Sequence, residues 1–228
     1  MPSGLFLPLA TNHIQSHIFA NQINCNERLK NKLWRDTIFA KILNQALLFK
    51  AINKPYELLK NLLDQILTGD STNRESVAAV YYWKNIFDFE FRRERAGEPP
   101  NNFLNYGYAI LRATVARSLV ASGLLPTLGI HHHNRYNPFC LADDIMEPFR
   151  PFVDQLVYQI YNSDKSKKDL TPDIKKKFLT IPTIDVIFDD EKFPLMIGLQ
   201  RTTASLAKCF DKTSETINYP LLYAFKRL

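Results

Sequence analysis

The stretch LADDIMEPFRPFVDQLVYQI, residues 141–160, carries apolar side chains at alternating spacings of four and three. These positions are Ala142, Met146, Phe149, Val153, Leu156 and Ile160. Such spacing is typical of a helix that buries one face. Pro148 and Pro151 each remove a hydrogen bond from this helix, so we expect a kink within it.

Helical spacing continues on both sides of this stretch. We predict helices over residues 26–49, 55–67, 71–87, 104–123 and 194–210. Residues 92–102, 124–139 and 162–177 are polar and are predicted to be loops or helix ends, and residues 1–23 an extended lead-in. Residues 181–193 predict a short hairpin with Asp189 and Asp190 at its turn. The fold class is therefore mainly α: a multi-helix domain over residues 24–228 with at most one hairpin.

Composition narrows the class of protein further. The net charge of +6 suits an anionic partner such as DNA but does not identify one. Cys25, Cys140 and Cys209 are far apart and form no CxxC pair, which excludes a zinc knuckle and a disulfide framework. No uncharged apolar run approaches the roughly 20 residues that span a bilayer. We expect a cytoplasmic protein with no membrane segment.

The segment around Glu75 allows two interpretations. Residues 72–75 (TNRE) fit a capping box, in which the Thr72 hydroxyl and the Glu75 carboxylate satisfy free backbone N–H groups. Alternatively, Glu75 presents its carboxylate from the first helical turn to a cleft, where it would bind Mg²⁺ or Mn²⁺ through oxygen. The sequence around Glu75 leaves both open.

His131, His132 and His133 are adjacent, so their side chains diverge and cannot all face one site. An exposed polar loop would explain each of them singly. However, these and His13 and His17 are all the histidines of the chain, so the clustering is notable. A neutral imidazole beside carboxylates suits Mn²⁺ or Zn²⁺ better than Ca²⁺.

Acidic residues gather on the helix of residues 141–160. At about 100° per residue, Glu147 lies beside the apolar stripe, with Asp143, Arg150 and Asp154 on the same flank. A carboxylate next to buried surface is costly unless it is paired or binds a metal. An exposed Glu147–Arg150 pair would supply only roughly a few tenths of a kcal/mol. Both the ion pair and the metal ligand stay possible.

Other catalytic templates are absent from the sequence. It contains no GxxxxGK[ST], GxGxxG, GxSxG or HExxH motif. A glycine-rich phosphate loop, a serine hydrolase elbow and a zinc-protease helix are therefore excluded.

Several stretches together resemble one known family. They are residues 104–112 (LNYGYAILR), 123–126 (GLLP), 129–132 (GIHH) and 141–151 (LADDIMEPFRP), with Asn73-Arg74-Glu75 upstream. These stretches resemble Cas1, the integrase of CRISPR spacer acquisition, in its type II form. That family normally also has an N-terminal β-rich domain, and residues 1–23 are expected to be the remnant that follows it.

The resemblance implies a site and a reaction. A divalent ion, Mg²⁺ or Mn²⁺, would be held by Glu75, His132 and Glu147, with Asp144 as an assisting acid. His132 is chosen because the family pattern Gly-x-x-His starts here at Gly129. The implied activity is that of a metal-dependent DNA endonuclease and integrase, in which the 3′-OH of a short duplex attacks a phosphodiester at the edge of the CRISPR repeat.

The resemblance also implies partners: double-stranded DNA, a second copy of the chain in a homodimer, and the small dimeric Cas2 protein. Candidates for phosphate contacts are Arg74, Arg112, Arg135 and Arg150, with a plain surface or ion-pair role equally open for each. The alternative functions are a non-catalytic helical DNA-binding or adaptor protein, and a metal hydrolase that acts on another phosphodiester.

Overall fold

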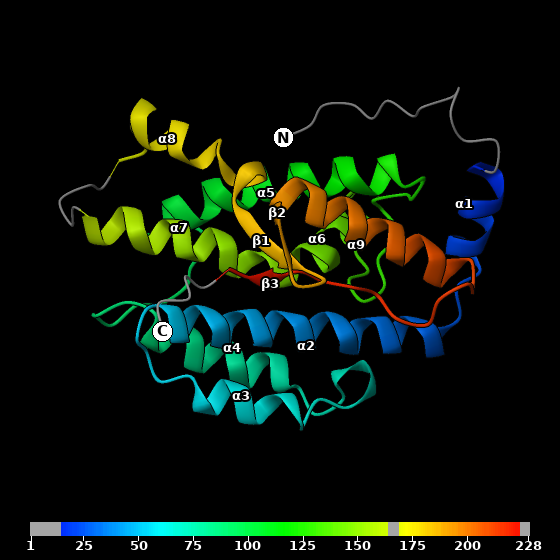
Figure 1. Cartoon of the computed structure of the whole chain (residues 1–228), viewed down its shortest axis with the longest axis horizontal. Helices are drawn as coiled ribbons and strands as arrows, with labels where there is room; N and C mark the ends of the chain where they lie inside the picture. Colours follow the sequence, from blue (N-terminus) through cyan, green and yellow to red (C-terminus); the bar gives the residue numbers. More distant parts are fainter. Residues whose placement is uncertain (1–14, 164–168, 224–228) are drawn as a thin grey trace.

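The computed structural model describes residues 15–163 and 169–223, which are mainly helical (Figure 1). The longer helices are α2 (Glu27–Ala51), α4 (Arg74–Asn85), α5 (Asn101–Ala121), α7 (Arg150–Ser163) and α9 (Leu195–Phe210). The shorter ones are α1 (Gln15–Ile23), α3 (Glu57–Leu63), α6 (Cys140–Met146) and α8 (Pro172–Phe178). Three 3₁₀ turns join them: η1 (Thr68–Asp70), η2 (Glu147–Phe149) and η3 (Ile181–Thr183).

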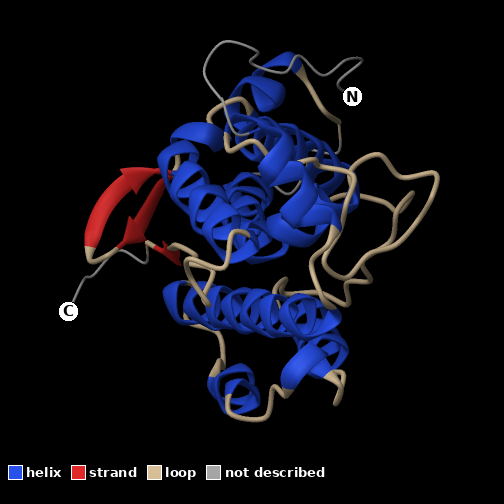
Figure 2. Ribbon diagram, turned by 90° about the vertical axis from the view of Figure 1, so that its right-hand side faces the viewer, coloured by secondary structure: helices blue, strands red, loops and turns tan. Residues whose placement is uncertain are grey.

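Helix α2 lies between two groups of helices. In Figure 1, α3 and α4 lie on one side of it and α5, α6, α7 and α9 on the other; Figure 2 shows the same division from the side. The start of α2 is fixed by the Asn26 side chain, which accepts a hydrogen bond from Leu29 N at 2.9 Å. Because α2 is covered on two sides, even polar side chains of its middle, such as Lys41 and Asn44, are buried.

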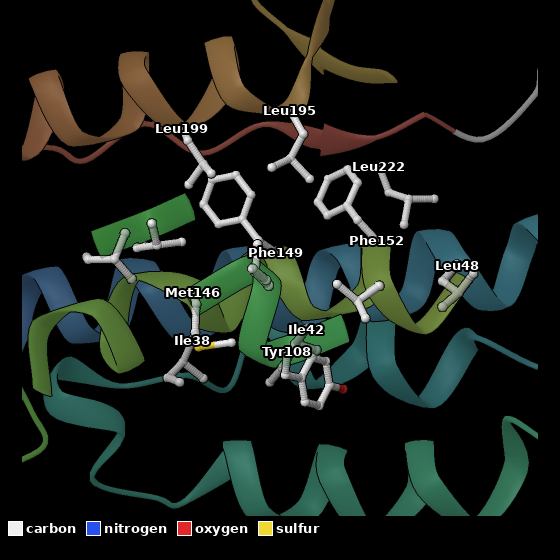
Figure 3. Close-up of a cluster of buried hydrophobic side chains, with 14 of the residues drawn as sticks. Ile38, Ile42, Leu48, Tyr108, Met146, Phe149, Phe152, Leu195, Leu199 and Leu222 are labelled. Atoms are coloured by element: carbon white, nitrogen blue, oxygen red, sulfur yellow. The ribbon is translucent and has the colours of Figure 1, made fainter. Parts of the chain in front are cut away.

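One cluster of buried hydrophobic side chains lies between α2, the α6–η2–α7 segment, α9 and β3 (Figure 3). Apolar side chains from six elements meet there: Ile38 and Ile42 of α2, Met146 of α6, Phe149 of η2, Phe152 of α7, Leu195 and Leu199 of α9, and Leu222 of β3. Helices α5 and α7 approach closely at Gly107. A Cβ on Gly107 would lie 2.5 Å from Val153 Cγ1, so only glycine fits this crossing.

The predicted hairpin is present. Strand β1 (Asp185–Phe188) pairs with β2 (Glu191–Pro194) in antiparallel register, Val186 opposite Phe193. Asp189 and Asp190 form the turn with φ of 52° and 63°, the left-handed conformation that a two-residue hairpin needs. A short β3 (Leu221–Leu222) adds to the other edge of β1, so the sheet order is β2-β1-β3.

The mainly α prediction is confirmed, and all five helices predicted outside the 141–160 stretch are present with shifted ends. The kink expected at Pro148 is also present, because η2 separates α6 from α7. Within the described part of the chain, no helix is both long and apolar enough to cross a membrane.

Two predictions of irregular structure were wrong. Residues 15–23 form α1, not an extended lead-in; residues 1–14 of that lead-in lie outside the described residues. Gln22 fixes α1 by exchanging hydrogen bonds of 2.9 Å with the backbone of Leu125, a contact that leaves no periodic pattern in the sequence. Residues 172–178 form α8, which buries Ile174 and Phe178 although lysines dominate its composition.

Candidate metal centre

Glu75 lies in the first turn of α4, but it is not part of a capping box. The Asp70 carboxylate caps this helix, because its two oxygens accept Arg74 N at 2.8 Å and Glu75 N at 2.9 Å. The Thr72 hydroxyl donates instead to the carbonyl of Gln65 at 3.2 Å. The capping-box interpretation is therefore wrong, and the Glu75 carboxylate is left for another role.

That role is an ion pair with a lysine that sequence analysis missed. Lys41 Nζ lies 2.6 Å from Glu75 Oε1 and 2.7 Å from Glu147 Oε2, so one ammonium joins the two carboxylates. Lys41 is only 8% exposed. The signal for it was present: a lysine between Ile38 and Ile42 falls on a buried helix face, where a charge needs a partner.

Glu147 belongs to η2 and is 6% exposed. Arg150 Nε donates to its other oxygen at 2.8 Å, so the predicted Glu147–Arg150 ion pair is present, but buried and not at the surface. Burial alone would raise the pKa of Glu147. The charges of Arg150 and Lys41 outweigh burial and lower this pKa to about 2. Glu147 is therefore an anion throughout the physiological range.

Asp144 is fully buried and organises the loop that carries His132. Its Oδ2 accepts the backbone N–H of Ile130 at 2.7 Å and of His131 at 3.0 Å. Its Oδ1 accepts the backbone N–H of His132 at 3.2 Å and contacts His132 Nδ1 at 2.5 Å. A Cβ on Gly129 would lie 2.4 Å from the backbone carbonyl oxygen of His132 and 2.9 Å from Asp144 Oδ2, which explains the glycine at this position.

These contacts set the chemistry of His132. With Nδ1 held by Asp144, Nε2 is the nitrogen left to bind another group, and a carboxylate behind a histidine is the usual arrangement at metal ligands. The hydrogen bond that His132 donates to Asp144 raises the pKa of His132, and the nearby charges of Glu147 and Glu75 act in the same direction. His132 thus lies in the electrostatic range of both carboxylates.

The three histidines diverge, as expected. The His131 ring stacks on the buried Trp34 ring, with centroids 4.0 Å apart and planes 2° from parallel. The His132 ring meets Trp34 edge-on at 5.8 Å and 89°. His133 is exposed. Trp34, which sequence analysis did not single out, therefore helps to fix the rings of two histidines.

In residues 15–163 and 169–223, no three His, Cys, Asp or Glu side chains lie close enough together to hold a metal as they stand. Instead, Glu75 and Glu147 share the positive charge of Lys41, and His132 contacts Asp144. Two carboxylate oxygens converging on one cation, beside an imidazole, are nevertheless the donor types that Mg²⁺ or Mn²⁺ accepts.

The four arginines predicted for phosphate contact differ in their surroundings. Arg112 is held by Asp143 at 2.8 Å and by Asn137 at 2.7 Å, which favours its ion-pair role. Arg150 is paired with Glu147 and lies over the ring of Tyr108, 4.5 Å from its centroid.

The other two arginines are less constrained. Arg135 is exposed and stacks on Tyr136, itself 77% exposed. Arg74 has a buried Nε with no hydrogen-bond partner among the described residues.

Two cavities adjoin the site. One, of about 390 Å³, opens beside His132 and has Lys30, His133 and Arg135 among its lining residues. The other, of about 180 Å³, adjoins the Lys41–Glu147 ion pair and is lined by Lys41, Gln45, Ala79, Trp83, Arg93, Tyr108, Glu147, Arg150 and Asp154. The sequence did not indicate that Gln45 or Arg93 would lie beside the predicted ligand Glu147 in such a cavity.

Asp154 is a buried carboxyl group that lines the smaller cavity. Its two oxygens accept hydrogen bonds from the hydroxyls of Tyr82, at 2.8 Å, and of Tyr108. Burial raises the pKa of Asp154 to about 6, although both tyrosines act against this rise.

Comparison with known proteins identifies the family. The family model described as CRISPR associated protein Cas1 matches residues 2–187. The CRISPR-associated endonuclease Cas1 of Neisseria meningitidis serogroup C (strain 8013) is 36% identical over 231 residues, which cover 99% of this chain and 75% of the relative. A second Cas1 endonuclease, from Pyrobaculum aerophilum, is 31% identical over 137 residues. These cover 59% of this chain and 46% of the Pyrobaculum protein.

Solved structures share the fold at low sequence identity. A casposase bound to its integration product has a TM-score of 0.73 at 20% identity and covers 95% of this chain and 70% of its own. A Cas1 protein from Thermotoga maritima has a TM-score of 0.68 at 19% identity, over 86% of this chain and 69% of its own. A Cas6-RT-Cas1–Cas2 complex gives 0.71 at 20% identity, over 98% of this chain and 28% of that one. The matched family model and the Neisseria relative show that this chain belongs to the Cas1 family.

Proposed function

We propose that this chain is a divalent-metal-dependent DNA nuclease and integrase of CRISPR adaptation, acting through Glu75, His132 and Glu147. The observation that carries the proposal is the convergence of the Glu75 and Glu147 carboxylates on one cation, 2.6 and 2.7 Å from Lys41 Nζ. His132, oriented by Asp144, adds an imidazole within electrostatic range of both.

Relatives support this activity. The Neisseria and Pyrobaculum relatives are named endonucleases, and the casposase neighbour is bound to an integration product. Another neighbour is a complex that contains Cas2. We infer that double-stranded DNA and a Cas2 protein are partners of this chain, with the type II form of the system and a homodimer as further expectations.

The donor set fits Mg²⁺ or Mn²⁺. Glu75 and Glu147 would supply oxygens and His132 Nε2 a nitrogen, while the buried, saturated Asp144 keeps His132 in one orientation. A bound ion would lower the cost of forming the 3′ alkoxide and offset negative charge on the attacked phosphate. Glu147 needs no deprotonation step for this role because its pKa is about 2.

The surface near His132 suits a DNA strand. The cavity of about 390 Å³ beside His132 has Lys30, His133 and Arg135 among its lining residues. The residue after Arg135 is Tyr136, whose ring is exposed. Basic groups hold phosphates and an exposed ring can stack on a base. We infer that the strand bearing the 3′-OH enters here, so that Arg135 contacts backbone phosphate.

The test is strand transfer of a short labelled duplex into a repeat-containing plasmid with Mn²⁺. His132→Ala and Glu75→Gln are each expected to reduce transfer by about 100-fold or more, because each removes a ligand. His17→Ala, which changes an exposed histidine of α1 that pairs with Asp211, is the control and should retain activity. Full activity in a folded His132→Ala protein would refute the ligand assignment. DNA binding without any Mn²⁺-dependent transfer or cleavage in the wild type would favour the adaptor function.

A further inference from the structure

Lys41 occupies the position that the proposed ion would need. Its ammonium lies 2.6 and 2.7 Å from the carboxylate oxygens of Glu75 and Glu147 and is largely screened from water. A divalent ion bound to the same two oxygens would meet this like charge at short range in a medium of low dielectric constant. The ion and the ammonium therefore compete for the two carboxylates.

A second place for the ammonium exists one helical turn away. Gln45 follows Lys41 by four residues on α2, so the two side chains are neighbours on the helix surface. Both line the cavity of about 180 Å³. Gln45 is 3% exposed, and its Oε1 has no hydrogen-bond partner among the described residues. A buried acceptor without a donor is costly, and an ammonium offers three donors.

We propose that Lys41 is a mobile internal counter-ion with two positions. Without a divalent ion it pairs with Glu75 and Glu147 and holds them together. When the ion binds, the Lys41 ammonium moves into the adjoining cavity and donates to Gln45 Oε1. This inference rests on the proposed function, since it requires Glu75 and Glu147 to be metal ligands, and it makes Lys41 and Gln45 positioning residues for that site.

In its second position the ammonium would also join the guanidinium groups of Arg93 and Arg150, which line the same cavity. Three cations there would outnumber the carboxylates of Glu147 and Asp154, the more so because Glu147 would then be neutralised by the ion. The chemical class that such a cavity accepts is a phosphodiester anion. Metal binding would thus increase the affinity of this part of the site for a DNA phosphate.

The experiment is a double-mutant cycle on Mn²⁺ affinity, measured by isothermal titration calorimetry without DNA. The variants are Lys41→Met, Gln45→Met and the double variant, with the exposed Lys50→Met on the same helix as control. Lys41→Met is expected to bind Mn²⁺ roughly tenfold more tightly, because no ammonium must be displaced. Its metal-free melting temperature should fall, because two carboxylates lose their shared cation.

Gln45→Met is expected to weaken Mn²⁺ binding about threefold in the wild-type background, and to have no effect when Lys41 is already Met. Unchanged or weaker Mn²⁺ binding by Lys41→Met would overturn the proposal, as would an equal effect of Gln45→Met in both backgrounds. If those results occur while Glu75→Gln still abolishes Mn²⁺ binding, the mobile Lys41 is rejected and the proposed function is retained. If neither wild type nor Lys41→Met binds Mn²⁺, both proposals fail.

Discussion

At the scale of single residues, Asp144 shows how much of a site can depend on one fully buried carboxylate. Four donors converge on its carboxylate: three backbone N–H groups and His132 Nδ1. An amide in its place would turn an NH₂ group towards some of these donors. The loop of residues 130–132 and the orientation of the His132 ring therefore depend on the same two oxygens.

We predict that Asp144→Asn lowers the free energy of unfolding by about 2 kcal/mol, because buried backbone donors lose their acceptor. Urea denaturation measures this change. The pKa of His132, measured by NMR titration of its ring protons, should also decrease, since the hydrogen bond to Asp144 is the main cause of its rise. Asp143→Asn is the matched control, because Asp143 pairs with Arg112 and not with a histidine. An unchanged pKa of His132 would contradict the orienting role.

Asp154 predicts a pH dependence of stability with a definite sign. Burial raises its pKa in the folded protein to about 6, above the ordinary aspartate pKa of about 3.9. Between about pH 4 and pH 6 the folded protein therefore holds a proton that the unfolded chain has lost. The contribution of Asp154 to the free energy of unfolding is therefore largest below about pH 4. It decreases by on the order of 3 kcal/mol as the pH rises to about 6.

The measurement is urea unfolding at several pH values for the wild type and Asp154→Asn, whose difference isolates this group. Between about pH 4 and 6 the free energy of unfolding of the wild type should decrease relative to that of Asp154→Asn, and above about pH 6 the two curves should run parallel. The exposed Asp173→Asn variant should follow the wild type at every pH. Parallel curves for Asp154→Asn throughout would mean that the carboxyl is not protonated in this range.

How far the sequence predicts the site depends on the residue. Glu75, His132 and Glu147 could be named from the family register, and their role as ligands stays a prediction. Lys41, Gln45 and Trp34 were missed, although helical spacing places all of them on one predicted helix of residues 26–49. Spacing indicates which face is buried. It does not tell which carboxylate or imidazole from another element meets that face.

At the scale of elements, the crossing of α5 and α7 depends on Gly107. We predict that Gly107→Ala lowers the free energy of unfolding by about 1–3 kcal/mol, because its Cβ would overlap Val153 Cγ1 and press on Phe178. Val153→Ala on the same background should restore part of the loss by vacating that space. Thermal or urea unfolding of the single and double variants tests this. Equal losses for the single and double variants would show that the contact at Val153 is not the cause.

Elements with a repeated apolar face were predictable, and those fixed by a few tertiary contacts were not. The hairpin was predicted because Asp189 and Asp190 mark a turn between apolar residues. Helix α1 depends on Gln22 binding the backbone of a loop about a hundred residues later, and β3 consists of two residues paired with β1. Helix α8 was hidden by its lysines, since only Ile174 and Phe178 face the core.

At the scale of the whole molecule, the proposed ligands come from opposite sides of α2. Glu75 is carried by α4 in the smaller group of helices, and Glu147 by η2 in the larger one (Figure 1). Local sequence could not show this arrangement, since 72 residues separate the two glutamates and nothing near either one marks the other. The resemblance to a family supplied that link instead.

This division of the ligands has a consequence for local opening of the protein. The first turn of α4 can separate from η2 only if its link through Glu75 breaks, and a divalent ion would strengthen that link. At about 100 times its Kd, a bound ion stabilises the closed state by about 2.7 kcal/mol. We therefore predict that Mn²⁺ at this concentration slows amide hydrogen exchange at residues 76–79 by roughly 100-fold. Mass spectrometry of deuterium uptake measures it, and Glu75→Gln should show no Mn²⁺ effect. Local opening of the first turn of α4 would then become rarer as the ion concentration rises, so that the metal supply would set the local stability of this turn as well as support the chemistry of the site.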